Sequence, residues 1–536
     1  MMNERGETIV TWRSAELAFT ARTSSGHPYA ELWMRVEFES PTGARYVVPG
    51  FWDGERRWLA RFAPNAAGAW TWKTVSNDRG LDGRQGAFFA ETYEGELPAY
   101  RHGFLRTKGR GFVHADGTPF FWLGDTVWSA SAHATREEWL RYVAARGRQG
   151  FNVAQINSLP QWDASTAEHR KPFAESDGGF DYGRPNPEYF RFLDGLVCGA
   201  SDAGLIVAMV VLWFNYVPET NVGWGRQWGK PMSPGEARKF AAYLAARYAA
   251  YGVVWLISGD TDYESETARR TYREAARAVR EASPYCALLT AHLNGGLATP
   301  ETMHEEGWLD FHMFQSCHFS DSVERALSYA AKDRAYEPAR PVLNGEPCYD
   351  RLRIMDPGNE EGRRFDRELV RETAWASLLG GANAGLTYGA HGLWPWHRDG
   401  QPYPEAMYGH PPTWEEALTL DSGDDMVRMK RLLESLPWME LEPVREGVRA
   451  GSDGVRVVAS VAPGRFIAYA RRSTALELDP SRSFSAAAPV ARASWHRPDG
   501  GSSEPARWRR RPDGGLTIEP PGWPGDAVLV LELGDQ

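Results

Sequence analysis

Hydrophobic and polar residues alternate with a period of two along the first part of the chain, from about residue 8 to residue 97. The alternation is clearest at Leu32, Met34, Val36 and Phe38, which face one way while the residues between them face the other. Gly, Pro and Asp-Gly turn signals separate these short strands. We therefore expect residues 1–97 to form an N-terminal β-sandwich.

Between about residues 98 and 435, short apolar runs alternate with longer helical stretches. The eight runs are FFWLG from Phe120, FNVAQIN from Phe151, LIVAMVVLW from Leu205, VVWLIS from Val253, ALLTAH from Ala287, FHMFQS from Phe311, PVLNGE from Pro341 and AGLTYG from Ala384. Thr135 with Glu138, and Ser233 with Glu236, have the spacing of capping boxes at helix starts. This rhythm predicts a parallel (β/α)8 TIM barrel over residues 98–435. No Gly-rich dinucleotide loop follows the first run.

Strand patterns return near the C-terminus, at residues 455–458, 466–470 and 527–533, with Gly/Pro/Asp turns between them. We expect residues 436–536 to form a small second β-sandwich. The predicted fold class is therefore multidomain: an α/β TIM barrel flanked by an N-terminal and a C-terminal β-sandwich, both packed against it.

Active-site residues of such barrels lie at the carboxyl ends of the strands, because these ends converge on one face. A polar or aromatic side chain follows nearly every run. The candidate substrate-binding residues are Asp125, Trp128, Gln155, Asn157, Trp213, Asn215, His292, Gln315, His318, Tyr388, His391 and Trp394.

Asp260 and Glu346 fit a pair of catalytic carboxylates best. Each directly follows an apolar strand and a glycine, which places the carboxyl group at the rim of the barrel. Cleavage of a glycosidic bond needs one carboxylic acid to protonate the departing oxygen and a second carboxylate as nucleophile or base. The sequence therefore predicts a glycoside hydrolase.

Several residues keep two interpretations. Asp260 could instead cap the next helix, and Asp262, Glu264 and Glu266 compete for its role. Asp125 either binds sugar hydroxyls or holds the first loop. His292, His318 and His391 either bind hydroxyls or are satisfied imidazoles of the core.

Tryptophan is unusually frequent, with 23 copies. Indole rings stack on the apolar faces of sugars, although buried Trp more often fills a core. Trp213, Trp224, Trp228, Trp394 and Trp396 lie in predicted loops, which favours a sugar-binding platform.

The net charge of −10, with no long basic stretch, argues against a nucleic-acid partner. The four cysteines lack the paired spacing of a zinc site, and the histidines lack a pattern such as HExxH, so neither a metal nor another cofactor is expected. The first residues contain no apolar signal segment, and no stretch reaches 18 apolar residues. The expected protein is cytoplasmic, has no membrane partner and acts on a small-molecule carbohydrate.

The segments PFFWLGDTVW, FNVAQIN, VVWLISGD, PVLNGE and NAGLTYGAHGLWPW together resemble the apiosidase-like glycoside hydrolases. The resemblance covers nearly the whole chain. It implies release of a terminal furanosyl residue, apiose in the named activity, from plant pectic side chains or plant glycosides. It also implies catalytic carboxylates at Asp260 and Glu346.

By analogy with barrel glycosidases that use strands four and seven, Asp260 would be the acid/base and Glu346 the nucleophile. The fourth strand of the wider clan usually ends in Asn-Glu. Because Asp260 is shorter, the carboxyl separation, and with it retention or inversion, stays open.

Two other functions compete with hydrolysis. The first is a non-catalytic carbohydrate-binding protein on a degenerate barrel, which the intact carboxylate pair disfavours. The second is a metal-dependent lyase or isomerase, which would need clustered ligands at one rim.

Overall fold

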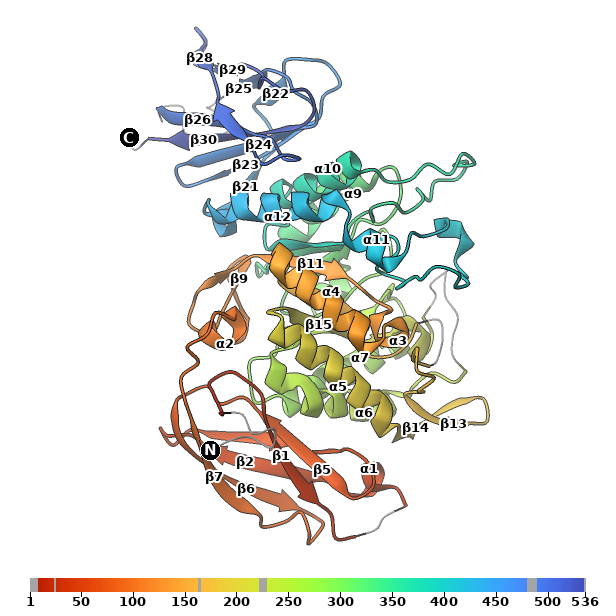
Figure 1. Ribbon diagram of the computed structural model, residues 1–536. Coiled ribbons are helices and arrows are strands. Elements are labelled where there is room, and N and C mark those ends of the chain that lie inside the picture. The colour runs from red at the N-terminus through yellow and green to blue at the C-terminus, as the bar shows by residue number, and fades with distance from the viewer. Residues whose placement is uncertain (1–7, 24–25, 162–164, 221–228, 480–488, 535–536) are drawn as a thin grey trace.

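The computed structural model describes residues 8–23, 26–161, 165–220, 229–479 and 489–534. The chain forms three consecutive regions. Figure 1 shows the N-terminal strands at one end, the barrel in the middle and the C-terminal strands at the other end.

Two antiparallel sheets form the N-terminal region and enclose a core that includes Phe38, Phe62 and Trp70. The first sheet has the order β1 (Ala15–Thr20), β5 (Arg57–Phe62), β4 (Phe51–Trp52), and the second β3 (Arg45–Pro49), β2 (Met34–Glu39), β6 (Gly68–Ser76), β7 (Gln85–Ala90). Met34, Val36 and Phe38 are buried in β2 as the alternation predicts, whereas Leu32 lies before the strand, at the end of the short helix α1 (Pro28–Glu31). The predicted sandwich is confirmed.

A short connection leads into the barrel. It contains α2 (Pro98–His102) and a three-stranded sheet of β8 (Arg106–Lys108), β9 (Gly111–Val113) and β10 (Pro119–Phe120).

Eight parallel strands form the central sheet, and each overlaps one of the eight predicted apolar runs; β11 and β16 extend one or two residues beyond theirs. In spatial order they are β17 (Leu289–Thr290), β16 (Val254–Gly259), β15 (Ile206–Trp213), β12 (Val153–Asn157), β11 (Trp122–Thr126), β20 (Gly385–Tyr388), β19 (Val342–Glu346) and β18 (His312–Gln315). At the seam between β17 and β18, Asp310 N–H donates to the carbonyl of Leu289 at 2.9 Å, and Thr290 Oγ1 donates to the carbonyl of Phe311 at 2.7 Å. These bonds close the predicted TIM barrel.

Helices cover the outside of the barrel (Figure 1). They are α3 (Ala130–His133), α4 (Arg136–Gln149), α5 (Pro187–Asp202), α6 (Pro234–Tyr248), α7 (Glu266–Ala282), α8 (Glu301–His304), α9 (Ser322–Arg334), α10 (Arg367–Leu379), α11 (Trp414–Leu418) and α12 (Asp421–Glu434). Both predicted capping boxes are present, Thr135 with Glu138 and Ser233 with Glu236. Between β12 and α5 the hairpin β13 (Phe173–Ser176) and β14 (Gly179–Pro185) extends from the barrel.

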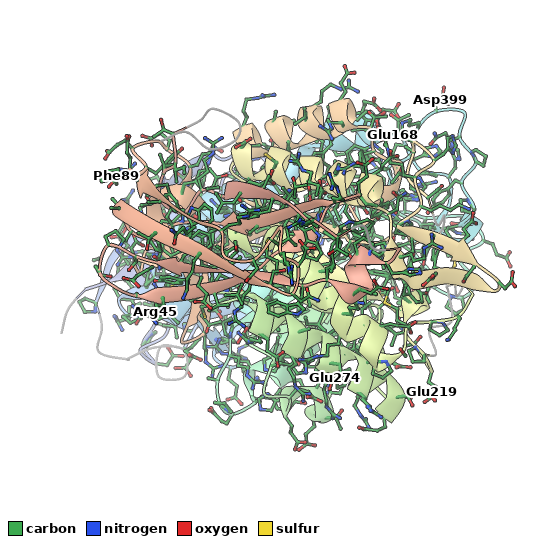
Figure 2. The ribbon with its side chains drawn as sticks, turned by 90° about the horizontal axis from the view of Figure 1, so that it is seen from below. Arg45, Phe89, Glu168, Glu219, Glu274 and Asp399 are labelled. Atoms are coloured by element: carbon green, nitrogen blue, oxygen red, sulfur yellow. The ribbon has the colours of Figure 1, made fainter. Side chains whose placement is uncertain are left out.

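The loops that follow the strands lie on one side of the molecule. Figure 2 labels Glu168, Glu219 and Asp399, from the loops after β12, β15 and β20, and all three lie on the same side of that view. This side is the carboxyl end of the barrel.

Two more antiparallel sheets form the C-terminal region, as predicted. One has the order β21 (Glu442–Val444), β23 (Val457–Ala462), β24 (Arg465–Ala470), β30 (Ala527–Leu533), β26 (Val490–His496), β27 (Ser503–Pro505), and the other β22 (Val448–Ala450), β25 (Leu476–Leu478), β29 (Leu516–Ile518), β28 (Trp508–Arg510).

Buried ion pairs join both flanking regions to the barrel. Arg61 of β5 and Arg247 of α6 share the carboxylate of Asp194 in α5, at 2.7 and 2.6 Å. Arg371 of α10 makes two bonds to Asp526, at 2.6 and 2.8 Å. The expected packing of the β regions against the barrel is confirmed. None of the described helices is long and apolar enough to cross a membrane.

Candidate active site

A cavity of about 140 Å³ opens at the carboxyl end of the barrel. Its lining combines aromatic rings with polar groups: Trp128, Gln161, Trp213, Asp260, Asn294, Gly295, Gln315, Cys317, His318, Phe319, Glu346, Tyr349, Leu352, Met355, Trp394 and Tyr408. Apolar walls with a few converging polar groups are typical of small-ligand sites.

Glu346 is the last residue of β19 and receives hydrogen bonds at both carboxylate oxygens. Oε2 accepts from Trp128 Nε1 and from His292 Nε2, each at 3.1 Å. Oε1 lies 3.0 Å from His318 Nε2. The side chain is only 8% exposed, so these donors replace the water that would otherwise solvate its charge.

Asp260 directly follows β16, with a left-handed backbone conformation (φ 46°). Before it, Gly259 lies against Trp213, and a Cβ there would be 1.9 Å from the indole, so only glycine permits this approach. The helix-cap interpretation of Asp260 is wrong, because Ser265 accepts from the amides of Thr267 and Ala268 at the start of α7.

The other acidic candidates after β16 do not reach the cavity. Glu264 and Glu266 are exposed, and Glu266 pairs with Arg269 and Arg273. Asp262 accepts a hydrogen bond from the amide of Glu264 and does not line the cavity.

His292 lies between the two carboxylates and is completely buried. Its Nε2 is 3.1 Å from Glu346 Oε2 and 3.4 Å from Asp260 Oδ1. Gln315 Nε2 is 3.4 Å from Asp260 Oδ1 and 3.2 Å from His292 Nε2. The functional oxygens of Asp260 and Glu346 lie within 4.8 Å of one another, so barrel closure brings the predicted pair together in one cavity.

These contacts determine the protonation states of His292 and Glu346. Burial alone would lower the pKa of His292, but hydrogen bonds to Asp260 and Glu346 outweigh it and raise the pKa to about 9. Burial alone would raise the pKa of Glu346, but hydrogen bonds from His292 and His318 hold it well below its usual range. At neutral pH His292 is therefore an imidazolium, and it lies beside an ionised Glu346.

The same trio offers a set of metal ligands. One imidazole nitrogen and two carboxylate oxygens, from Asp260, His292 and Glu346, lie within 4.8 Å of one another. Imidazole and carboxylate together suit Zn²⁺ and similar ions.

The structure separates the predicted substrate-binding residues into two groups. Trp128, Trp213, Gln315, His318 and Trp394 line the cavity, and His292 contacts both carboxylates. Asp125, Gln155, Asn157, Asn215, Tyr388 and His391 do not line it.

Asp125 faces the helices. Its Oδ2 accepts from Arg146 Nε at 2.6 Å and from Tyr142 at 2.9 Å, and its side chain has no exposed surface. The interpretation of Asp125 as a substrate-binding residue is therefore wrong. Its side chain instead anchors β11 to α4. Tyr388 similarly donates to Asp350 at 3.2 Å.

Three of the four remaining members of the second group are also held by contacts within the protein, whereas both polar side-chain atoms of buried Asn157 have no hydrogen-bond partner among the described residues. Gln155 bonds the carbonyl of Gly345 inside the barrel, and Asn215 Nδ2 donates to the carbonyl of Gln161 at 2.9 Å. Asn157 lies buried at the end of β12. His391 lies 3.3 Å from the hydroxyl of Tyr403, and burial lowers its pKa to about 3, which indicates a neutral imidazole of the interior.

The tryptophans predicted in loops also divide, and the loop prediction is wrong for Trp213, which is the last residue of β15. Trp213 and Trp394 line the cavity as expected of a platform, whereas Trp396 is buried and stacks on Trp414, with ring centroids 5.0 Å apart. Trp224 and Trp228 lie outside the described residues.

Several residues that line the catalytic cavity were not predicted from the sequence. Tyr349, whose hydroxyl lies 3.0 Å from Trp128 Nε1, follows Glu346 by three residues and was the easiest to find. Phe319, Leu352, Met355 and Tyr408 come from loops after β18, β19 and β20, and the pattern of apolar runs carries no signal for them.

The parallel barrel, its cavity at the carboxyl end and the two carboxylates that meet there are features of the glycoside hydrolase class, and the family match assigns the chain to that class. The chain belongs to the apiosidase-like family: residues 106–440 match the model described as "Apiosidase-like, catalytic domain". Residues 8–77 match a domain of unknown function, DUF5060. No curated protein matches the sequence.

Solved structures share the fold. A structure named only as a glycoside hydrolase has 23% identity and a TM-score of 0.68 over 82% of this chain and 98% of its own. A glycoside hydrolase family 5 structure from Bacteroides vulgatus ATCC 8482 has 23% identity and a TM-score of 0.68 over 82% of this chain and 95% of its own. Another from that strain, described as a proposed glycoside hydrolase, reaches a TM-score of 0.70 at 17% identity over 98% and 99% of the two chains.

Proposed function

We propose that the enzyme removes a terminal, furanosyl and apiose-like residue from plant-derived glycosides or oligosaccharides, with Asp260 and Glu346 as the catalytic pair. The single observation that supports this most strongly is the position of their oxygens, within 4.8 Å of one another across one cavity. Membership of the apiosidase-like family supports the choice of a furanosyl substrate.

The short separation favours retention of anomeric configuration. Retaining glycosidases hold their carboxyl groups about 5–5.5 Å apart, whereas inverting enzymes need about 6.5–9.5 Å to admit a water molecule. We assign the nucleophile to Glu346, because three side-chain N–H groups stabilise its charge. Asp260 then acts as the acid/base, and the proton that it passes to the departing oxygen comes from the imidazolium of His292, whose Nε2 lies 3.4 Å from Asp260 Oδ1.

The two steps follow from this assignment. Glu346 attacks the anomeric carbon as Asp260 donates its proton to the leaving group, which gives a covalent glycosyl-enzyme. Asp260 then takes a proton from water, which attacks the same carbon and frees Glu346. Neither step requires a cofactor.

The size of the cavity favours a small terminal unit. Its volume of about 140 Å³ is below the roughly 300–1,000 Å³ of sites for larger ligands. Trp128, Trp213 and Trp394 offer indole surface to one sugar ring. This volume favours a terminal residue over an interior segment of a polysaccharide.

The test is hydrolysis of aryl glycosides by purified protein, with apiofuranoside, arabinofuranoside, rhamnoside and galactoside compared. We expect activity on a furanoside, and loss of at least about 10³-fold in Asp260→Asn and Glu346→Gln with unchanged thermal unfolding. Full activity in either variant removes that residue from the mechanism. Binding without hydrolysis of every glycoside would instead indicate a non-catalytic sugar-binding protein.

A further inference from the structure

A second cavity, of about 430 Å³, lies between the N-terminal strands and the β13–β14 hairpin. Its volume falls within the roughly 300–1,000 Å³ of ligand sites. The lining is Gly26, His27, Pro28, Tyr29, Trp52, Glu55, Phe173, Ala174, Gly183, Arg184, Pro185, Asn186 and Pro187, and we refer to it as the interdomain cleft.

Trp52 forms one side of the interdomain cleft and is held in a fixed orientation. It is the last residue of β4 and remains partly exposed. Its Nε1 donates to the carbonyl of Glu55 at 3.0 Å, and its own carbonyl accepts from Tyr243 at 3.2 Å. A fixed, partly exposed indole loses little conformational freedom when a flat ligand stacks on it.

The opposite side is equally well supported. Phe173 of β13 is buried and packs against Phe240 of α6 and Tyr182 of β14, with ring centroids 5.5 and 5.1 Å apart. Pro185 and Pro187 add rigid surface at the start of α5. Both sides of the interdomain cleft are therefore held in place by contacts within the protein.

Charged groups border these apolar surfaces. Arg184 and Glu55 line the cleft and are exposed, and neither has an ion pair within the part of the chain that the structure describes. Arg184 therefore offers N–H donors to a ligand, and Glu55 offers carboxylate acceptors. Apolar ring surface beside free charged and polar groups suits a sugar, whose rings have apolar faces and hydroxyl edges.

The interdomain cleft lies toward the carboxyl end of the barrel. The β13–β14 hairpin lies in the connection that follows β12, which also carries Gln161 of the catalytic cavity, and Figure 1 shows the hairpin beside α1 and α6. A glycan bound there would be kept near the mouth of the barrel.

We propose that the interdomain cleft binds a segment of an oligosaccharide, with one sugar ring stacked on Trp52, its hydroxyl groups bonded by Arg184 and Glu55, and a sugar carboxylate, where there is one, bonded by Arg184. Residues 8–77, which match a domain of unknown function, thereby supply one wall of a carbohydrate-binding site. A protein segment would be an alternative occupant, but the fixed indole and the open charges favour a glycan.

The test is calorimetric binding of cellohexaose, xylohexaose and hexagalacturonate to the full chain carrying Glu346→Gln, which prevents hydrolysis. We expect at least one probe to bind and Trp52→Ala to weaken it roughly tenfold or more, as loss of one stacking ring does at nucleic-acid sites. Trp33→Ala is the matched control, because Trp33 is 47% exposed in the same region but outside the cleft.

Arg184→Ala provides a second variant in case Trp52→Ala alters thermal unfolding, since the exposed Arg184 side chain makes no ion pair within the described residues. It should weaken hexagalacturonate most. Equal binding by the parent and the Trp52 variant, or binding of no probe, overturns the proposal.

The outcome is independent of the proposed hydrolysis. Trp52→Ala should leave turnover of a small aryl glycoside unchanged, because that substrate occupies the catalytic cavity alone. Inactivity toward every aryl glycoside would defeat the proposed function while leaving the binding result intact.

Discussion

The Nε2 atom of His292 lies 3.1 Å from Oε2 of Glu346, deep in the barrel. His292 leaves β17 and Glu346 ends β19, so two strands far apart in the sequence supply the contact. The imidazolium compensates the negative charge of Glu346, whose side chain is only 8% exposed. It also places a proton within 3.4 Å of Asp260.

The first prediction concerns alkaline pH. The pKa of His292 is raised to about 9, so the proton present at neutral pH is lost as pH rises through 9. Above that pH the neutral imidazole no longer stabilises ionised Glu346, and kcat/KM should fall. His292→Gln should have lower activity and lack the alkaline limb near pH 9. An unchanged limb in this variant would assign the titration to another group.

The second prediction concerns stereochemistry. The first product formed should keep the anomeric configuration of the substrate, because the carboxyl oxygens lie within 4.8 Å. Proton NMR during the first minutes of hydrolysis measures the anomeric configuration of the first product directly. Azide should rescue Glu346→Ala as a glycosyl azide of inverted configuration. Initial formation of the opposite anomer would require a water molecule between the carboxylates.

The third prediction concerns metals. Zn²⁺ should inhibit by binding to Asp260, His292 and Glu346, while dialysis against EDTA should leave activity unchanged, because the two-carboxylate route uses no metal. Calorimetry should show zinc binding weakened at least about tenfold in His292→Gln. Loss of activity in EDTA, restored by a divalent ion, would contradict the proposed mechanism.

The fourth prediction separates structure from binding at Asp125. Asp125→Ala leaves the buried guanidinium of Arg146 without its partner and should lower the free energy of unfolding by about 3–5 kcal/mol. KM should not change, because Asp125 does not line the cavity. Chemical denaturation and steady-state kinetics measure the two effects. Asp399→Asn, on an exposed loop, should change neither.

The apolar runs predicted the barrel because a strand of a closed parallel sheet is buried on both faces and must be apolar throughout. LIVAMVVLW became β15, Ile206–Trp213, with every residue buried. The ends of the strands were predicted less accurately. The run ALLTAH predicts a longer strand than β17, which has two residues. There the amide of Leu289 donates to the side chain of Asp310, and Thr290 Oγ1 donates to the carbonyl of Phe311.

The site was predictable in part. The Gly-acid endings of β16 and β19 located Asp260 and Glu346, since a carboxylate directly after an apolar strand points to the rim. The same rule failed for Asp125, whose position in β11 points outward to Arg146. Successive side chains of a strand point to opposite faces of the sheet, so a shift of one residue decides whether a side chain points into the barrel or toward the helices.

By itself, the sequence determined the eight strands, the helix starts and the two acidic residues, because burial, capping and backbone turns are local properties of the chain. Only the tertiary structure decided that His292 lies between Asp260 and Glu346, that Asp125 belongs to the helix layer, and that Trp52 faces the β13–β14 hairpin. These contacts join residues far apart along the chain, and their geometry depends on closure of the barrel and on the packing of one region against another.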